Sequence, residues 1–324
     1  MRSESMDALD RVRSYGIIPV LGLKNPKTAP ALAEALEKGG LPLIEVTLRN
    51  PGALECIEAI KAEHPSILVG AGTVLTCAQA DSAKKSGADF IVSPGFNPRV
   101  VQHCLERKIP IVPGCTTASE IEIALELGLT TVKFFPSESL GGLGMINQLA
   151  GPFSNVKFVV TGGMDFNTIE RYLKNDHVAA VGGSFVAPNR LIESNSWDEI
   201  TALCKKAVSM SLGFAIAHVG FSGSSSAEGT ATAEWFSERF GLPVTKGERS
   251  TFAGTDIESG NIPFPGEHGH IGFYTNSVER AVAYFSRKEI PLREEFKHVD
   301  GKGNLNAVYL AEEIRGFAVH IVKR

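Results

Sequence analysis

The sequence predicts a (β/α)8 barrel of the TIM type, followed by a smaller α+β domain built from paired βαβββ modules. Up to about Gly213, short apolar runs rich in Val and Ile alternate with helical stretches rich in Ala, Leu, Glu and Lys. Eight such runs begin 19 to 26 residues apart, which is the length of one βα unit. After Gly213 this pattern stops, and a different pattern of strands and one helix occurs twice.

Each apolar run is expected to form a strand buried on both faces, because it lacks the alternation typical of half-exposed strands. Strands of this kind belong to parallel sheets with helical crossovers. A doubly wound open sheet is the alternative, and the count of eight βα units favours the barrel. The predicted strands are Ile17–Leu21, Leu43–Leu48, Ile67–Gly70, Phe90–Ser93, Ile109–Pro113, Thr131–Phe135, Lys157–Thr161 and Ala179–Gly182.

The division into domains is predicted at 1–213 and 214–324. The second domain contains two copies of a module of roughly 50 residues, and such self-similarity indicates a repeated structural unit. The segment His218-Val-Gly-Phe corresponds to His270-Ile-Gly-Phe, and each is followed by a predicted helix and three short strands. The two helices are predicted at Thr230–Phe240 and Ser277–Lys288, and Ser222–Gly229 is predicted to be a loop.

Composition and charge exclude several classes of function. The 324 residues include 32 Lys+Arg and 36 Asp+Glu, so the formal net charge is −4, and both signs are mixed along the chain. A nucleic-acid partner is not expected, because it would require a basic surface. We also expect no membrane span and no secretory signal, since the apolar runs are short and the first residues are charged. Five widely spaced cysteines are typical of reduced thiols, which predicts a cytoplasmic protein.

The active site of such a barrel lies at the C-terminal ends of its strands. Glu45, Thr47 and Arg49 alternate along the second predicted strand, so their side chains are expected on one face. A carboxylate between two apolar neighbours is costly to bury, which indicates that Glu45 has a chemical role. The structural alternative is an internal ion pair of Glu45 with Arg49 or Lys133.

Lys133 lies in the sixth predicted strand, between Val132 and Phe134. Burial in these apolar surroundings disfavours the charged ammonium and favours a nucleophilic amine. Such an amine attacks a ketone and forms a Schiff base. The alternative is a lysine that only reaches solvent at the strand end. Phe135 shares the parity of Lys133 and is expected to face the same way.

Paired glycines occur at the ends of the last two predicted strands. Gly162 and Gly163 follow the seventh strand, and Gly182 and Gly183 end the eighth, directly before Ser184. Backbone N–H groups at such glycines can approach an anion, with a helix N-terminus behind them. One pair would most often be only a tight turn, whereas two pairs at these positions indicate the phosphate site typical of such barrels.

Taken as a set, residues 12–212 resemble the class I aldolases that act on 2-keto-3-deoxy-6-phosphogluconate (KDPG) and 4-hydroxy-2-oxoglutarate (KHG). Small departures such as Phe185 and Met164 do not touch the chemistry, whereas the second domain is an addition to the usual family member. The matching segments are IIPVL (17–21), IEVTLR (44–49), VGAGTV (69–74), SPG (93–95), KFFPSE (133–138), LAGPF (149–153), TGGM (161–164) and GGSFVAP (182–188).

This resemblance implies a role for each barrel residue. Lys133 would be the Schiff-base lysine and Glu45 the general acid/base. The substrate would be held by Arg49 and Thr73 at its carboxylate, by Pro94 and Phe135 along the pocket, by Thr161 at its hydroxyls, and by Gly162, Gly163, Gly183 and Ser184 at its phosphate.

The resemblance also implies the reaction and its setting. The iminium accepts the electrons of the broken bond, so the aldolase would need no metal and no other cofactor. Small 2-oxo acids would be the substrates: KDPG would give pyruvate and glyceraldehyde 3-phosphate, as in the Entner–Doudoroff pathway, and KHG would give pyruvate and glyoxylate. A homotrimer is expected.

The second domain resembles the vicinal oxygen chelate (glyoxalase/dioxygenase-like) superfamily in its paired modules. Two interpretations stay open for it. It is either a ligand-binding or oligomerisation module with ordinary strand histidines, or a metal-dependent enzyme. In the second case His218, His270 and His320, with a carboxylate such as Asp256 or Glu258, would bind a divalent transition metal. His320 then stands where the resemblance would place a carboxylate.

Overall fold

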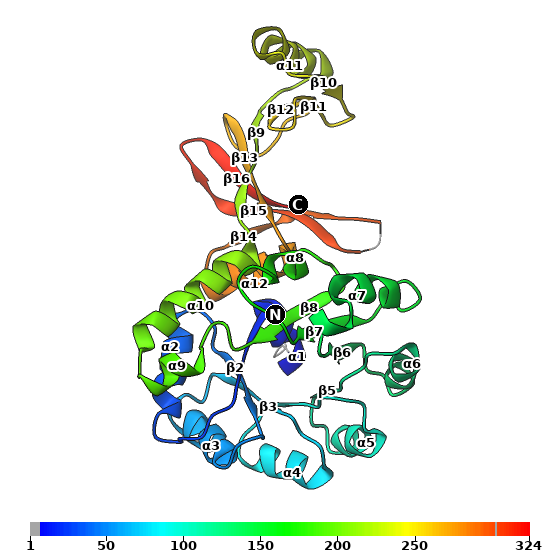
Figure 1. The fold of residues 1–324 in the computed structure, drawn as a ribbon. Helices are drawn as coiled ribbons and strands as arrows, with labels where there is room; N and C mark the ends of the chain where they lie inside the picture. Colours follow the sequence, from blue (N-terminus) through cyan, green and yellow to red (C-terminus); the bar gives the residue numbers. More distant parts are fainter. Residues whose placement is uncertain (1–6, 302) are drawn as a thin grey trace. The chain divides into compact units, whose positions relative to one another are not determined.

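The computed structural model describes residues 7–301 and 303–324 of the chain (Figure 1). It divides between Ser211 and Leu212 into two compact units. In the described ranges, each unit is built on its own eight-stranded sheet. The fold class predicted from the sequence, a parallel barrel followed by a mixed α+β domain, is confirmed. None of the helices in these ranges is long and apolar enough to cross a membrane.

The first unit is a barrel of parallel strands, with its helices on the outside (Figure 1). Its strand order is β5-β4-β3-β2-β1-β8-β7-β6, and the neighbouring strands pair in parallel. Most strand residues are buried, as expected for strands covered on both faces. The strands are β1 (Ile17–Leu21), β2 (Leu43–Thr47), β3 (Leu68–Gly72), β4 (Phe90–Val92), β5 (Ile111–Val112), β6 (Thr131–Phe134), β7 (Lys157–Thr161) and β8 (Val178–Gly183).

The barrel closes between β5 and β6 through a short bridge at Lys133. Gly114 pairs in parallel with Lys133. The Lys133 N–H donates to the Pro113 carbonyl at 2.8 Å, and the Cys115 N–H donates to the Lys133 carbonyl at 2.9 Å. This bridge joins the two edge strands of the sheet, so the alternative of an open doubly wound sheet is wrong.

Local signals determine where the barrel helices begin and end. Thr76 and Thr117 begin helices with capping boxes, in which each threonine and the residue three positions later satisfy free N–H groups. The helices are α1 (Ala8–Tyr15), α2 (Ala29–Lys38), α3 (Ala53–Glu63), α4 (Cys77–Lys85), α5 (Pro98–Glu106), α6 (Ala118–Glu126), α7 (Gly142–Ala150), α8 (Ile169–Leu173), α9 (Asn189–Glu193) and α10 (Trp197–Leu212), with the 3-10 helix η1 (Glu138–Leu140) after β6.

Four predicted strands extended one residue too far at their C-terminal ends, and for two of them this affects candidate site residues. β2 ends at Thr47 and β6 ends at Phe134. Arg49 and Phe135 therefore lie in the loops that follow these strands, and the parity argument does not apply to either residue. Both loops are at the C-terminal end of the barrel, where the active site was expected.

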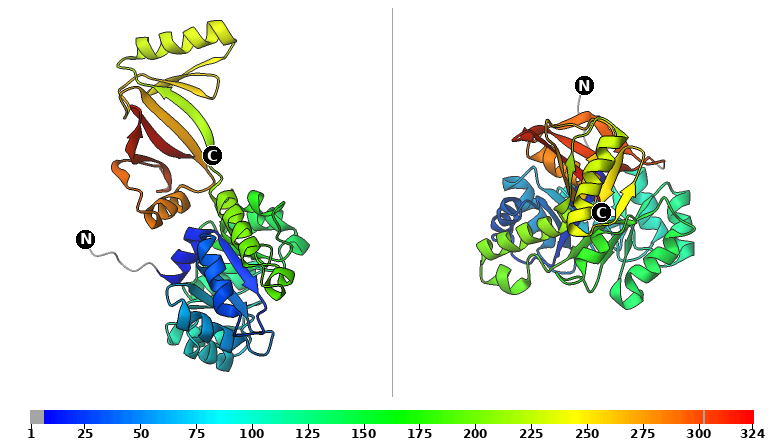
Figure 2. Two further views of the ribbon diagram at one scale, coloured as in Figure 1. Left: turned by 90° about the vertical axis from the view of Figure 1, so that its left-hand side faces the viewer. Right: turned by 90° about the horizontal axis from the view of Figure 1, so that it is seen from above.

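The second unit contains the two predicted βαβββ modules, which pair through their first strands (Figure 2). Its strand order is β10-β11-β12-β9-β13-β16-β15-β14. The first module consists of β9 (Ala215–Phe221), α11 (Ser226–Phe240), β10 (Val244–Lys246), β11 (Ser250–Ala253) and β12 (Ile257–Gly260). The second consists of β13 (Gly269–Thr275), α12 (Val278–Arg287), β14 (Leu292–Val299), β15 (Leu305–Ile314) and β16 (Phe317–Lys323).

Helix α11 begins four residues earlier than predicted, inside the segment expected to be a loop. Ser225 is its N-cap, and the Ser225 side chain accepts from the Glu228 N–H. Glu228 in turn accepts from the N–H and the hydroxyl of Ser224. These bonds satisfy the groups that a helix start leaves free, so Ser/Gly-rich composition was a poor guide here.

Candidate functional site

The two residues expected to carry the chemistry of the barrel lie side by side. Nζ of Lys133, on β6, is 3.5 Å from Oε1 of Glu45, on β2. Glu45 is completely buried and Lys133 is 7% exposed. The ion pair that was the structural alternative therefore exists, but it includes the reactive candidate itself and faces the barrel interior.

The Glu45 carboxylate has acceptor capacity that the protein does not use. Among the described residues, neither of its oxygens has a hydrogen-bond partner. The Oγ1 atom of Thr161, at the end of β7, is also buried without a partner there. Buried polar atoms are normally hydrogen-bonded, and those that are not require a functional explanation. Both residues therefore have unused hydrogen-bonding capacity inside the barrel.

The loop after β2 contains Arg49, which is exposed, and its Nε donates to Oγ1 of Thr47 at 3.3 Å. Thr47 in turn donates to the Leu21 carbonyl on β1. Thr73 follows β3 with a φ of 59°, a left-handed conformation that is costly for a β-branched residue. Strain of this kind is concentrated at functional sites. Arg49 and Thr73 thus stand at the ends of two adjacent strands.

The predicted pocket residues follow β4 and β6. Pro94 comes shortly after β4, and its carbonyl oxygen lies so close to Gly114 that a Cβ there would be 2.2 Å away. Phe135 is 40% exposed, and Nζ of Lys133 lies 5.5 Å from the centre of its ring. The ring therefore covers the amine at the C-terminal end of the barrel.

The turn at Gly162 and Gly163 is held by a cluster that the sequence analysis did not find. Both glycines have positive φ angles, of 95° and 84°. A Cβ on Gly163 would lie 2.8 Å from Cβ of Glu138, whose carboxylate accepts from Tyr172 and from Arg171. Glu138 is the last residue of the KFFPSE segment, and that segment was the signal that could have revealed it.

The second glycine pair lies beside the first. A Cβ on Gly183 would be 3.5 Å from Cβ of Met164, and Ser184 is exposed directly after β8. The helix N-termini expected behind the pairs are not there, since α8 begins only at Ile169 and α9 at Asn189. A phosphate at these turns would thus be held by loop N–H groups and the Ser184 hydroxyl rather than by a helix dipole.

The structure therefore places the predicted barrel residues within six different strands or in the loops that follow the C-terminal ends of these strands. A buried amine beside a carboxylate can act as a nucleophile with an adjacent acid/base. The family model for KDPG and KHG aldolases matches residues 9–203. The chain belongs to this aldolase family.

Curated relatives of this aldolase match the same part of the chain. The 2-dehydro-3-deoxy-phosphogluconate aldolase of Treponema pallidum is 48% identical over 200 residues, which cover 62% of this chain and 94% of the relative. The KHG/KDPG aldolase of Escherichia coli K12 is 39% identical over 192 residues, which cover 59% of this chain and 90% of the relative.

Solved aldolase structures match the barrel as well. The KDPG aldolase of Legionella pneumophila, described with pyruvate captured as a covalent carbinolamine intermediate, is 37% identical with a TM-score of 0.61. The match covers 62% of this chain and 98% of that one. The enzyme of Zymomonas mobilis ZM4, described with 3-phosphoglycerate, is 38% identical with a TM-score of 0.58, covering 64% and 97%.

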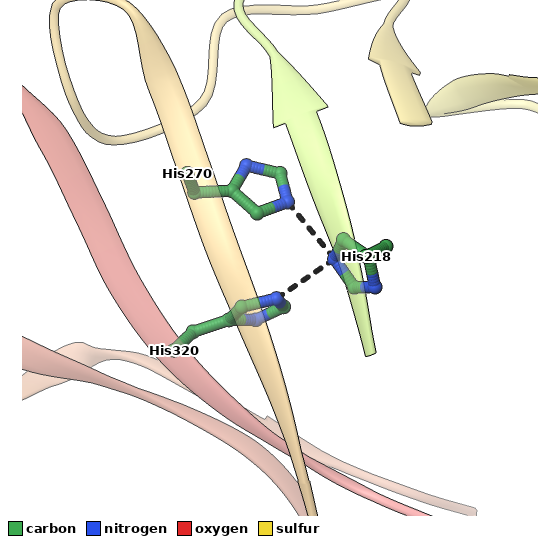
Figure 3. A group of neighbouring side chains, drawn as sticks. All are labelled: His218, His270 and His320. Atoms are coloured by element: carbon green, nitrogen blue, oxygen red, sulfur yellow. Dashed lines mark hydrogen bonds between the residues drawn. The ribbon is translucent and has the colours of Figure 1, made fainter. Parts of the chain in front are cut away.

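The candidate metal ligands of the second unit lie beyond the segment that the aldolase family model matches. His218 on β9, His270 on β13 and His320 on β16 point toward one another (Figure 3). Their ligand atoms lie within 4.8 Å of one another. Glu258, on β12, joins them, whereas Asp256 precedes β12 and accepts from the Thr255 hydroxyl. Of the two carboxylates left open by the sequence, Glu258 is the one beside the histidines.

The surroundings of this cluster alter its acidity. Burial lowers the pKa of His320 to about 3, with help from His270 and His218. Burial alone would raise the pKa of Glu258, but hydrogen bonds from His218, His270 and Ser250 hold it far below its usual range. The His320 imidazole is thus neutral and the Glu258 carboxylate charged near neutral pH, the states in which both can bind a metal.

Proposed function

We propose that the barrel is a class I aldolase that cleaves KDPG to pyruvate and glyceraldehyde 3-phosphate, with Lys133 as the Schiff-base nucleophile. The observation that carries this proposal is the buried Nζ of Lys133, 3.5 Å from Oε1 of Glu45. The names of the relatives support KDPG as the substrate. The covalent carbinolamine described for the Legionella pneumophila enzyme supports a mechanism with a covalent intermediate.

The reaction begins with attack of Nζ of Lys133 on the C2 ketone of the substrate. The resulting carbinolamine loses water and becomes an iminium ion. Glu45 transfers the protons that this dehydration requires, either directly or through a water molecule. Both Glu45 oxygens have acceptor capacity to spare within the described structure, so the carboxylate is free to exchange protons with the substrate.

Carbon–carbon cleavage follows from the same arrangement. Glu45 accepts the proton of the C4 hydroxyl, the C3–C4 bond breaks, and its electron pair moves through C2 onto the iminium nitrogen. The aldehyde leaves, and an enamine of pyruvate stays on Lys133. Protonation at C3 and hydrolysis then release pyruvate and the free amine. The nitrogen is the electron sink, so this scheme uses no metal and no other cofactor.

The remaining site residues bind the substrate in this scheme. Arg49 and Thr73 hold the carboxylate, and Thr161 binds a substrate hydroxyl with its Oγ1, which has no hydrogen-bond partner in the described part of the chain. Pro94 and Phe135 line the pocket. The phosphate is held by Ser184 and by the backbone of Gly162, Gly163 and Gly183. KHG, which has no phosphate, would be cleaved to pyruvate and glyoxylate with less binding energy to use.

The setting of the enzyme is part of the proposal. We infer a cytoplasmic homo-oligomer, a trimer by family resemblance, whose partners are small 2-oxo acids. The five cysteines are free thiols, which supports a reducing compartment. The second unit is inferred to bind a ligand of its own. Sedimentation of the full chain would measure the assembly.

Borohydride trapping tests the Schiff base. Reduction in the presence of pyruvate should inactivate the protein and attach one reduced pyruvyl group, found by peptide mass on Lys133. Lys133→Ala should abolish the label and turnover, while Lys157→Ala, at the opposite end of β7 from the site, should keep both. A label on a different lysine, or activity lost to a chelator and restored by metal, would overturn the proposal.

A further inference from the structure

We propose that Glu138 is a positioning residue for the phosphate of the substrate, because it holds the turn of Gly162 and Gly163 in place. Through this turn it favours phosphorylated 2-oxo acids over those without a phosphate. Glu138 lies in η1, directly after β6, and the turn follows β7. The inference rests on the proposed aldolase function and adds to it a determinant of the substrate class.

The backbone around Glu138 is bonded directly to the turn. The Glu138 N–H donates to the Gly162 carbonyl at 3.2 Å, and the Ser137 N–H donates to the Thr161 carbonyl at 2.8 Å. These two bonds continue the pairing of β6 with β7 beyond the end of β6. A shift of Glu138 would therefore move the backbone of the turn.

The side chain of Glu138 fills the space beside Gly163. A Cβ on Gly163 would lie 2.7 Å from Cγ of Glu138 and 2.8 Å from its Cβ. At the preceding position, a Cβ on Gly162 would lie 2.9 Å from Cα of Pro136. Both glycines have positive φ angles, which only glycine adopts at little cost. The turn thus packs against Pro136 and Glu138 with no room for a side chain, and its shape depends on where Glu138 lies.

Two residues of α8 hold the Glu138 carboxylate. The Tyr172 hydroxyl donates to Oε1, and Nη2 of Arg171 donates to Oε2. Tyr172 is completely buried, and burial raises the pKa of its hydroxyl, with a further rise from the bond to Glu138. The hydroxyl therefore keeps its proton near neutral pH and stays a donor. The carboxylate is thus fixed by two donors from a separate element of the fold.

Arg171 also balances the charge of Glu138. A carboxylate without a partner would repel a phosphate bound at the neighbouring turn. The Arg171 side chain is 53% exposed, and its guanidinium carbon lies 5.3 Å from the centre of the Tyr172 ring. The ring therefore braces the guanidinium beside the carboxylate. The pair of Glu138 and Arg171 supports the turn without adding net charge to it.

The two proposed substrates distinguish this role from a purely structural one. KDPG would bind to the turn through its phosphate, whereas KHG has no phosphate to bind there. The phosphate is remote from the reacting bond, so its contacts are the same in the ground state and the transition state. Their loss should raise KM for KDPG and change kcat little. A general disturbance of the barrel would instead impair both substrates.

Kinetics of the full chain with both substrates test the inference. Glu138→Ala should lower kcat/KM for KDPG by about 10-fold or more, the usual cost of losing hydrogen bonds to a charged group, and should do so through KM. The kcat/KM for KHG should stay close to the wild-type value. The control is Glu34→Ala, which removes an exposed ion pair with Lys38 on α2 and should leave both substrates unaffected.

A milder substitution protects the test against misfolding. Tyr172→Phe keeps the buried ring and removes only the hydroxyl, so it should shift the ratio of the two kcat/KM values in the same direction by a smaller factor. Circular dichroism checks the fold of every variant. Equal losses on KDPG and KHG, or an unchanged ratio in both folded variants, would overturn the inference.

Trapping with pyruvate and borohydride separates this outcome from a failure of the proposed function. Pyruvate has no phosphate, so Lys133 should be labelled in the wild-type chain and in every variant. A labelled Lys133 together with an unchanged substrate ratio would overturn the role of Glu138 alone. An unlabelled wild-type chain would overturn the aldolase function on which the inference rests.

Discussion

Gly72 leaves the space that the Glu45 carboxylate occupies. A Cβ on Gly72 would lie 2.1 Å from Oε1 of Glu45 and 2.8 Å from its Cδ. The two residues are on neighbouring strands, β2 and β3, and Gly72 pairs with Thr47, two positions after Glu45. Glu45, the proposed acid/base, can therefore take this orientation only because Gly72 has no side chain.

Gly72→Ala should lower the turnover of KDPG by about 10²-fold, because a displacement of about 1 Å at a reacting group costs that much. The carboxylate end of Glu45 can rotate away, so the fold should survive. Steady-state kinetics and circular dichroism are the measurements. Gly144→Ala, in α7 with no atom within 4 Å of the added Cβ, is the control. Equal kinetics for both variants would contradict the role given to Gly72.

Glu45→Gln should slow KDPG cleavage by about 10²–10⁴, the usual contribution of a general acid/base. The amide has nearly the same shape, so the loss reports on proton transfer rather than on packing. Trapping with pyruvate and borohydride should still label Lys133, although more slowly. If the variant turns over at the wild-type rate, Glu45 is only the ion-pair partner of Lys133.

Ser184→Asp should impair cleavage of KDPG far more than cleavage of KHG. The new carboxylate would stand where the phosphate is proposed to bind and would repel it. The ratio of kcat/KM for the two substrates measures the effect. Ser184→Asn has a similar size without charge and should change this ratio much less. Equal losses on both substrates would place the phosphate elsewhere.

Cysteine alkylation at pH 8 should modify Cys77 before the four buried thiols. Burial raises the pKa of Cys204 to about 12, and burial together with Glu120 raises that of Cys115 to about 12. Because only a thiolate reacts, a pKa near 12 leaves about one thiol in 10⁴ reactive at pH 8, and the rate should rise with pH. Mass spectrometry over time measures the order. In urea all five thiols should react alike. Early alkylation of Cys115 in the folded protein would contradict the burial of its thiol.

The sequence predicted the barrel well because buried parallel strands have a simple signal. β1 and β7 have the predicted bounds, and the eight runs correspond to eight strands of the described barrel. Errors occurred at strand ends, where a strand and the following loop have similar residues. Arg49 and Phe135 lie just beyond such ends. The sequence correctly predicted that they lie at the C-terminal end of the barrel, but the strand parity used to predict it does not apply to them.

In the candidate sites too, the sequence revealed only those residues whose signal is local. Lys133 and Glu45 were predicted because a charged residue inside an apolar strand is conspicuous. Glu138 was missed as a support of the Gly163 turn, because its Tyr172 and Arg171 partners are distant in the sequence. Asp256 and Glu258 could not be distinguished from the sequence, since residues two apart share a face. The structure distinguishes them, because Glu258 lies within β12 (Ile257–Gly260) and Asp256 precedes that strand.

The bridge between Gly114 and Lys133 closes the barrel between β5 and β6, and Lys133, the proposed nucleophile, is part of this bridge. The Lys133 backbone forms hydrogen bonds with the segment that follows β5, while β6 pairs with β7 along its other edge. Lys133 thus has two roles in one residue: its backbone completes the closed ring of strands, and its side chain lies beside Glu45 inside that ring.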